Sequence, residues 1–143
     1  MDYAVFEELL HVLTARWLPL RDKPEETPES LLRTLWFLAA GDHRAVEHCP
    51  EGALPPLSPQ ARDRLEDLLR QRLAGVPLAH LTGRQSFMAI EMLAGPEALI
   101  PRKETELLGY AALEVVRQTV ATQGYARVID LCTGCGNLAV ALA

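Results

Sequence analysis

The 143-residue sequence predicts an α+β protein in three parts, because the hydrophobic pattern changes twice along the chain. Residues 1–74 repeat apolar side chains at the spacing of amphipathic helices, which predicts a small helical bundle. Residues 75–103 carry glycine and proline among β-compatible runs, which predicts a β-hairpin linker. Residues 104–143 then predict a helix, a strand, a glycine-rich turn and another helix, as at the start of an α/β domain.

The first two predicted helices have apolar stripes of helical period. The first helix spans residues 2–18, and its stripe comprises Phe6, Leu9, Leu10, Leu13 and Trp17. The second starts at Pro28, a proline at the first helical position, behind the hydroxyl cap of Thr27. Gly41 marks its end. Both helices therefore have a face that must be buried.

A third helix is predicted after an irregular stretch. Residues 42–57 are interrupted by proline and glycine, and we interpret them as a loop with one short helical turn. Ser58 and Pro59 then restart a helix, and Gly75 is placed to terminate it with a left-handed residue. Its apolar stripe completes the bundle and comprises Ala61, Leu65, Leu68, Leu69 and Leu73.

The linker is expected to contain one β-hairpin. Residues 86–93 alternate imperfectly between apolar and polar side chains, and residues 98–100 form a short apolar run. Gly95 and Pro96 stand between the two runs. We therefore expect the hairpin to turn near these two residues.

The last part begins with a long helical pattern over residues 104–122, which Gly124 ends. Residues 127–131 follow as a short strand with a β-branched centre, and a helix is expected from Asn137 onward. A glycine-rich turn joins this strand to this helix. The order of elements is that of a βα unit.

Composition narrows the classes of function. The formal net charge is −5, which argues against general binding to nucleic-acid backbones. Residues 1–74 are the more acidic part, with a net charge of −4, as expected of a solvated acidic exterior or of a face toward a basic protein. No apolar run is long enough to span a bilayer, and the acidic start lacks a secretory signal. With three cysteines at no framework spacing, these features predict a cytoplasmic protein.

The segment richest in chemical information is Val128-Ile129-Asp130-Leu131-Cys132-Thr133-Gly134-Cys135-Gly136-Asn137. A strand that ends in a glycine turn and continues into a helix lets the backbone approach a ligand closely. The spacing differs from the dinucleotide motif, since no third glycine follows. A tight connection without any ligand is the alternative interpretation of the same turn.

The motif D-L-x-T-G-x-G resembles the first motif of class I methyltransferases, which have a doubly wound, Rossmann-like sheet. Upstream, the strings G-V-P-L-A-H-L-T-G and I-P-R-K-E-T-E stand in order before it, with Phe87 between them. Together the three motifs resemble the HemK/PrmC family of protein-glutamine methyltransferases, which act on peptide chain release factors. The resemblance covers residues 72–143 and implies that residues 104–143 begin a Rossmann-like methyltransferase domain.

This sequence departs from the family's usual residues at five positions. The family usually has an aromatic residue where this chain has His80, glycine where it has Ala89, and proline where it has Lys103. In the loop, the family usually has glycine at Cys132 and a small residue at Cys135. The loop glycines are retained. A neighbouring branch modifies a ribosomal protein, which leaves a ribosomal acceptor as an alternative, but the I-P-R-x-E-T-E string favours the release-factor branch.

The resemblance implies S-adenosylmethionine as cofactor, held by Asp130, Cys132, Thr133, Gly134, Cys135 and Gly136. A purely structural role for Asp130, accepting hydrogen bonds from backbone N–H groups of the turn, is the alternative. Phe87, Pro101 and Arg102 are expected to border the cofactor or substrate pocket. Arg102 has an alternative role as the ion-pair partner of Glu104 or Glu106.

Two parts of the family's site have no counterpart in the sequence: an acid after the second strand and an Asn-Pro-Pro-Tyr segment. In the family the latter grips the target amide, which is a poor nucleophile and must be positioned. We therefore expect the chain to be the N-terminal portion of such an enzyme, with no catalytic residue of its own, half a cofactor site and no activity. Apolar surface left uncovered on residues 107–142 predicts dimerisation or disorder of the last segment.

Two other functions remain open from the sequence. The C-x-x-C spacing of Cys132 and Cys135 suits zinc or thiol exchange, but zinc requires two further ligands. His48 and Cys49 belong to a distant loop without paired spacing, so we expect no metal. The second alternative is a non-catalytic protein-binding module, in which the bundle docks a partner and the glycine turn is structural.

Overall fold

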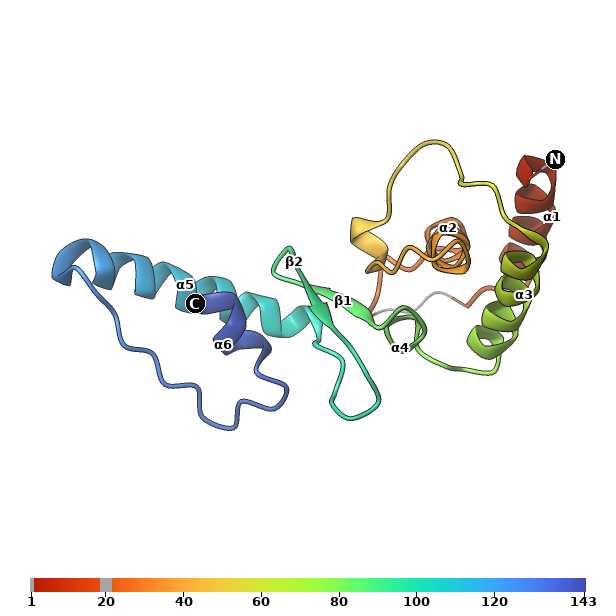
Figure 1. The fold of residues 1–143 in the computed structure, drawn as a ribbon. Helices are drawn as coiled ribbons and strands as arrows, with labels where there is room; N and C mark the ends of the chain where they lie inside the picture. The colour runs from red at the N-terminus through yellow and green to blue at the C-terminus, as the bar shows by residue number, and fades with distance from the viewer. Residues whose placement is uncertain (1, 19–21) are drawn as a thin grey trace.

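The computed structural model describes residues 2–18 and 22–143, and it places them in an elongated molecule with two ends (Figure 1). Helices α1 (Asp2–Ala15), α2 (Pro28–Ala39) and α3 (Pro59–Leu73) form a bundle at one end. Helices α5 (Lys103–Gln123) and α6 (Asn137–Leu142) lie at the other. A two-stranded antiparallel hairpin stands between them. The mixture of helices with a small sheet is the predicted α+β class.

The three bundle helices begin where the sequence predicts. The Thr27 side chain accepts a hydrogen bond from the Ser30 backbone N–H at 3.1 Å, and the Ser30 hydroxyl accepts one from the Thr27 N–H at 2.9 Å. This reciprocal capping box satisfies two amides that helix geometry leaves unpaired. Ser58 caps α3 in the same way, accepting from the Ala61 N–H at 3.2 Å. The cap residues therefore fix where α2 and α3 start.

Left-handed glycines end two of these helices. Gly75 has a φ of 99°, which lets its own N–H and that of Val76 bond back to Arg72 and Gln71. That pair of bonds is the Schellman arrangement, and it satisfies carbonyls that the last turn exposes. Gly41, with a φ of 98°, ends α2 likewise. Helix α1 ends at Ala15, three residues before the end of the predicted span.

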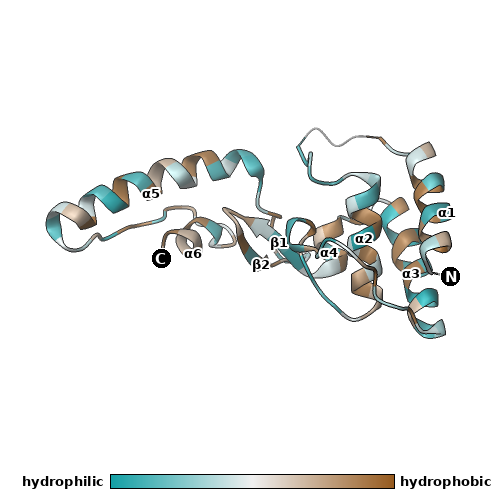
Figure 2. Ribbon diagram, turned by 90° about the horizontal axis from the view of Figure 1, so that it is seen from above, coloured by the Kyte–Doolittle hydropathy of each residue, from teal (hydrophilic) through white to brown (hydrophobic). Residues whose placement is uncertain are grey.

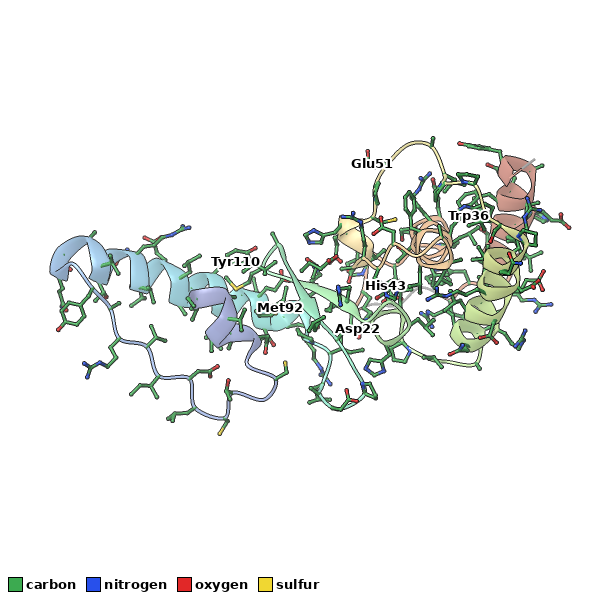
Figure 3. The ribbon with its side chains drawn as sticks, viewed as in Figure 1. Asp22, Trp36, His43, Glu51, Met92 and Tyr110 are labelled. Atoms are coloured by element: carbon green, nitrogen blue, oxygen red, sulfur yellow. The ribbon has the colours of Figure 1, made fainter. Side chains whose placement is uncertain are left out.

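The bundle encloses a closed apolar core, with α2 at its centre. Trp36 is 1% exposed, and its ring meets Phe6 of α1 edge-on with centroids 5.8 Å apart (Figure 3). Its indole N–H donates to the Pro55 carbonyl at 2.9 Å, so its polar atom is also satisfied. The other fully buried core side chains of α2 are Leu31, Leu32, Leu35 and Leu38. Packing of this kind makes the bundle the stable end of the molecule.

Two short helical segments complete the bundle. The predicted helical turn is the 3₁₀ helix η1 (Val46–His48). Helix α4 (Leu78–Thr82) was not predicted, because its five residues are too few to show a helical period. Leu78 belongs to the same core as α2 and α3. The bundle therefore packs against residues beyond position 74, and the proposed domain boundaries stay predictions.

The hairpin exists, but its turn is not where the sequence predicts. Strands β1 (Arg84–Phe87) and β2 (Ile90–Leu93) pair antiparallel, with Arg84 opposite Leu93 and Phe87 opposite Ile90. The turn is Met88-Ala89, with φ values of 50° and 61°. Two consecutive positive φ values match the twist of a tight two-residue hairpin, which glycine or asparagine usually provides. Without those residues, the turn was mistaken for part of a strand.

Residues 98–100 form no strand, and the Gly95-Pro96 pair bends an irregular loop that leads to α5. Helix α5 is confirmed, and Gly124, with a φ of 80°, ends it. The strand predicted over residues 127–131 is wrong, since this segment has no regular structure. A strand needs a hydrogen-bonding neighbour, and within the described part of the chain none lies beside it. Helix α6 is confirmed from Asn137.

Apolar residues occur at both ends of the molecule (Figure 2), but they are buried to different degrees. In the bundle they point inward, whereas on α5 the buried residue is Gly109. Large apolar side chains that remain exposed after residue 103 include Leu107, Leu108, Tyr125, Ile129 and Leu131. Among the described residues, no helix is both long and apolar enough to cross a bilayer.

Candidate cofactor site

The predicted cofactor loop, residues 130–136, is held in a defined shape by local contacts. The Thr133 hydroxyl donates to Asp130 Oδ2 at 2.9 Å, and the Gly136 N–H donates to the Thr133 carbonyl at 2.9 Å. Gly134 and Gly136 have φ values of 58° and 78°, which glycine adopts without cost. The Asp130 carboxylate thus helps to hold the loop through a hydroxyl, not through the backbone N–H groups of the turn, and this does not test its role toward a cofactor.

Cys132 shares the left-handed conformation of the glycines, with a φ of 60°. The family usually has glycine at this position, and the structure shows why glycine suits it. Cys132 and Cys135 are both exposed and free, and Cys135 Sγ lies 3.3 Å from Asn137 Oδ1. In the part of the chain that the structure describes, no three His, Cys, Asp or Glu side chains are placed to hold a metal.

The loop is open on one side. A groove of about 400 Å³ adjoins it, and Asp130 stands in its wall with apolar residues of α5 and α6. The apolar part of the lining includes Val116, Val120, Val128 and Leu142. Residues 131–135 themselves are exposed. A ligand could therefore reach the loop backbone without displacing any other part of the described structure.

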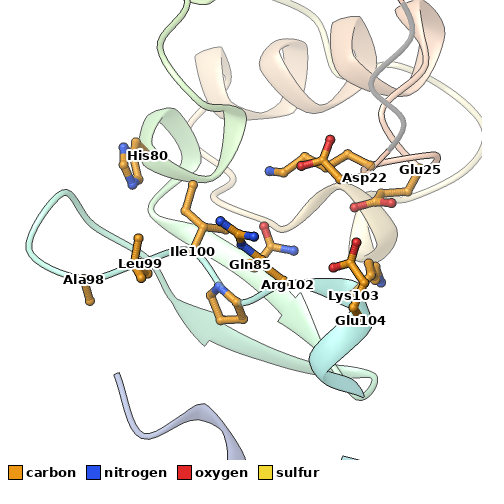
Figure 4. Close-up of a pocket in the computed structure, with 12 residues that line it drawn as sticks. Asp22, Glu25, His80, Gln85, Ala98, Leu99, Ile100, Arg102, Lys103 and Glu104 are labelled. Atoms are coloured by element: carbon orange, nitrogen blue, oxygen red, sulfur yellow. The ribbon is translucent and has the colours of Figure 1, made fainter. Parts of the chain in front are cut away.

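The three residues expected at a pocket border do not lie together. Phe87 is fully buried in β1 and does not line the pocket that Pro101 and Arg102 border. That pocket has a volume of about 260 Å³, and it lies between the 98–104 segment and the bundle (Figure 4). None of residues 130–136 lines it. The predicted site residues thus fall into three separate places: the hairpin interior, this pocket and the glycine loop.

Arg102 forms no ion pair with Glu104 or Glu106, so its alternative role as an ion-pair partner is wrong. Lys103 makes the ion pairs instead: its ammonium lies 2.6 Å from Glu47 Oε1 of η1 and 3.5 Å from Glu106 Oε1. Partial burial works against the charge of Lys103, but the hydrogen bond and charge of Glu47, with that of Glu106, raise its pKa. This lysine, where the family usually has proline, ties α5 to the bundle.

Glu25 faces the same pocket across from Lys103 (Figure 4). Burial raises the pKa of its carboxyl, and the charge of Glu47 adds to the effect. Its Oε2 atom is buried and has no hydrogen-bond partner. The sequence offered no signal for this residue, because Glu25 stands in an irregular segment without a motif. Such a carboxyl is expected to lose its proton at a higher pH than an exposed one.

Comparison with known proteins finds similarity to methyltransferases. The family described as the PrmC N-terminal domain matches residues 54–83. A release factor glutamine methyltransferase of Salmonella typhimurium is 42% identical over 88 residues, which cover 62% of this chain and 30% of that protein. The Burkholderia pseudomallei and Deinococcus radiodurans proteins of that name are 43% and 40% identical, over 62% and 60% of this chain and 30% of each relative.

The chain spans about 30% of the length of these curated relatives. Within that span it is similar to protein methyltransferases. More narrowly, the similarity is to release factor glutamine methyltransferases and to the PrmC N-terminal domain, as its sequence motifs indicate.

Proposed function

We propose that this chain supplies the bundle, hairpin and first cofactor loop of a cytoplasmic, S-adenosylmethionine-dependent methyltransferase. Its acceptor would be the side-chain amide of a glutamine in a peptide chain release factor. The observation that carries the proposal is the similarity to three release factor glutamine methyltransferases at 40–43% identity. The three ordered motifs, ending in a loop with two left-handed glycines, support it.

Residues 130–136 fit a role in holding the cofactor. The left-handed residues bend the backbone so that it can approach a ligand closely, and a Cβ added at Gly134 would meet nothing within 4 Å. The hydrogen bond from Thr133 fixes one oxygen of Asp130 in the loop wall. S-adenosylmethionine supplies an electrophilic methyl group when bound. Asp130 would face the cationic end of this cofactor, where opposite charges attract.

The bundle is the proposed recognition element for the protein substrate. Residues 1–74 carry a net charge of −4, which suits a basic surface on the partner. No direct contact with nucleic acid is proposed, because an acidic surface repels phosphate. Residues 1–143 alone are expected to bind a release factor without methylating it. An amide nitrogen is a poor nucleophile that must be positioned to react, and these residues contain no Asn-Pro-Pro-Tyr segment to position it.

A methyl-transfer assay with labelled S-adenosylmethionine tests the proposal. The samples are the 143-residue chain and a chimera that joins it to the remaining sequence of the Deinococcus radiodurans relative. We expect no turnover by the chain alone and methylation of a release factor by the chimera. A folded chimera that leaves release factors unmethylated would count against this acceptor, and methylation of a ribosomal protein instead would favour the neighbouring branch.

Glycine substitutions in the chimera test the proposed cofactor loop. Gly136→Ala forces a side chain into a left-handed conformation within the loop, and about 1–2 kcal/mol of strain is expected there. Gly124→Ala imposes the same strain at the end of α5 and is the matched control. We expect Gly136→Ala to raise the KM for the cofactor and Gly124→Ala to leave it near that of the parent. Equal effects would favour a structural turn and the binding-module alternative.

A further inference from the structure

The tip of the hairpin touches α5 at the place where Leu138 of α6 also approaches that helix. Met88 is buried although it lies in a two-residue turn. A Cβ added at Gly109 of α5 would overlap Met88 Sδ and lie 3.3 Å from Leu138 Cδ2 of α6. Because Gly109 has no side chain, the side chains of Met88 and Leu138 can pack closely against α5 at this position. Close packing of this kind transmits displacement, because interiors have few voids.

The first turns of α5 also make polar contacts with the hairpin tip and with η1. Lys103, Glu106 and Gly109 follow one another at intervals of three residues, so they share one face of the helix. Glu106 Oε1 accepts a hydrogen bond from the Met88 backbone N–H at 3.0 Å. Lys103 pairs with Glu106 and with Glu47 of η1. The tip of the hairpin is thus bonded by its backbone and packed by its side chain against one face of α5.

The hairpin is in turn anchored in the bundle. Phe87, next to the tip, is fully buried, and Glu91 Oε2 accepts a hydrogen bond from the Ala45 N–H at 2.7 Å. Beyond the tip, Leu138 is the second residue of α6, and Gly136 immediately precedes that helix. A helix of six residues is too short to hold its place by itself, so its orientation depends on packing. A continuous set of contacts therefore runs from the bundle to the glycine loop.

We propose that Met88, Glu106 and Gly109 form a joint that sets the position of the glycine loop relative to the bundle. Through Leu138 the joint orients α6, and α6 carries the loop at its start. In terms of the proposed function, on which this consequence rests, these three are positioning residues for the cofactor loop. As positioning residues they would act through packing and hydrogen bonding within the chain. They connect the element proposed to recognise the protein substrate with the element proposed to hold the methyl donor.

The substitution Gly109→Ala tests the joint, because packing at the joint and helix propensity predict opposite effects. By helix propensity alone, alanine stabilises a helix interior relative to glycine. In the joint, the added methyl group must displace Met88 from the gap beside Leu138. We therefore expect Met88 to become accessible, so that hydrogen peroxide oxidises it at least about fivefold faster relative to Met92 of the same hairpin. Peptide mass spectrometry measures both sulfoxides in one sample.

The amide resonances of Gly134 and Gly136 report whether the loop responds. We expect them to shift in Gly109→Ala and in Met88→Ala, which truncates the same contact without adding bulk. Ala121→Gly, an exposed site near the far end of α5, is the matched control and should leave them in place. Circular dichroism establishes that each variant is folded. Protection of Met88 together with loop resonances that match the control in both variants would overturn the joint.

Glu106 provides a graded test of the polar half of the joint. Glu106→Gln keeps an oxygen that can accept from the Met88 N–H but removes the charge that faces Lys103, whereas Glu106→Ala removes both. We expect a larger shift of the loop resonances for alanine than for glutamine. Equal and negligible shifts would leave Glu106 out of the joint. Titration of the unsubstituted chain with S-adenosylmethionine is a separate measurement, so loss of the proposed function and loss of the joint can be distinguished.

Discussion

The bundle and the segment after residue 103 differ in how their apolar side chains are covered. In the bundle the leucines of α2 are fully buried beneath α1 and α3, whereas Leu107, Ile129 and Leu131 are each more than 75% exposed. The bundle therefore has its own closed core, and α5 with α6 keeps its arrangement through a few contacts near Met88. The difference teaches that the closed core and the proposed cofactor loop lie in different parts of this chain, which meet at the contacts near Met88.

The largest expected effect comes from the centre of the bundle. Trp36→Ala removes a fully buried ring, its contact with Phe6 and its hydrogen bond to Pro55. We expect the free energy of unfolding to fall by about 3–5 kcal/mol, the usual cost of such a cavity. Urea unfolding followed by circular dichroism measures it. Tyr125→Ala, at a ring that is 66% exposed, is the control and should change the value by less than about 0.5 kcal/mol.

A buried ion pair in the bundle should give the next largest effect. Glu26 is 5% exposed and lies 3.0 Å from both the Lys23 ammonium and the Arg72 guanidinium. Glu26→Ala leaves two partly buried cations unpaired, which is expected to cost about 3 kcal/mol. Asp67→Ala breaks an exposed pair with Arg70 and should cost about 0.5 kcal/mol. Similar losses in the two variants, measured by urea unfolding, would contradict the assigned difference in burial.

We expect two copies of the chain to associate through α5 and residues 125–131, and not through the bundle. Apolar side chains of α5 and residues 125–131 offer uncovered surface, and we expect the 143-residue chain to dimerise through it. Leu107→Glu with Ile129→Glu should weaken the dimer by about tenfold or more, since each buried leucine or isoleucine contributes about 1.5–3 kcal/mol. Sedimentation equilibrium measures the association. Leu73→Glu on α3 is the control, and a monomer at every concentration would disprove the association.

The smallest expected effect is a dependence of stability on pH at Glu25. Burial raises the pKa of this carboxyl in the folded protein above its ordinary value of 4.5. Folding then favours the protonated form, so Glu25 lowers stability increasingly as pH rises from the unfolded toward the folded pKa. Glu25→Gln should therefore gain stability relative to the parent as pH rises above 4.5, measured by thermal unfolding. Glu51→Gln is the exposed control, and parallel pH profiles for parent and Glu25→Gln would refute the raised pKa.

The elements that the sequence predicted correctly are those whose signals are local. Thr27 and Ser58 cap the helices that follow them, and Gly75 and Gly124 end helices because left-handed glycine suits that position. The hairpin turn was misplaced because Met88 and Ala89 adopt positive φ without being glycine. Tertiary packing around Phe87 and Met88, invisible in a residue pattern, holds them there.

In the candidate site, too, the sequence predicted the locally determined features and missed those that depend on distant partners. The shape of the glycine loop follows from Gly134 and Gly136, which the motif already contained. The strand before the loop failed to form because strand pairing is a property of neighbours that no single segment encodes. Lys103 and Glu106 were found only in the structure, since their partners Glu47 and Met88 are distant in the sequence. Both residues belong to the motif I-P-R-K-E-T-E, in which the sequence predicts a pocket border only for Pro101 and Arg102.

The three thiols of the chain differ in exposure, so a thiol-reactive dye can label the glycine loop selectively. Cys132 and Cys135 are exposed on the glycine loop, whereas Cys49 is half-buried in the bundle, where burial raises its pKa and slows its reaction as a thiolate. A maleimide dye added briefly near neutral pH should therefore label the loop before the bundle. Fluorescence from that label would follow loop motion in real time, and Cys49→Ser would remove the background without altering the loop.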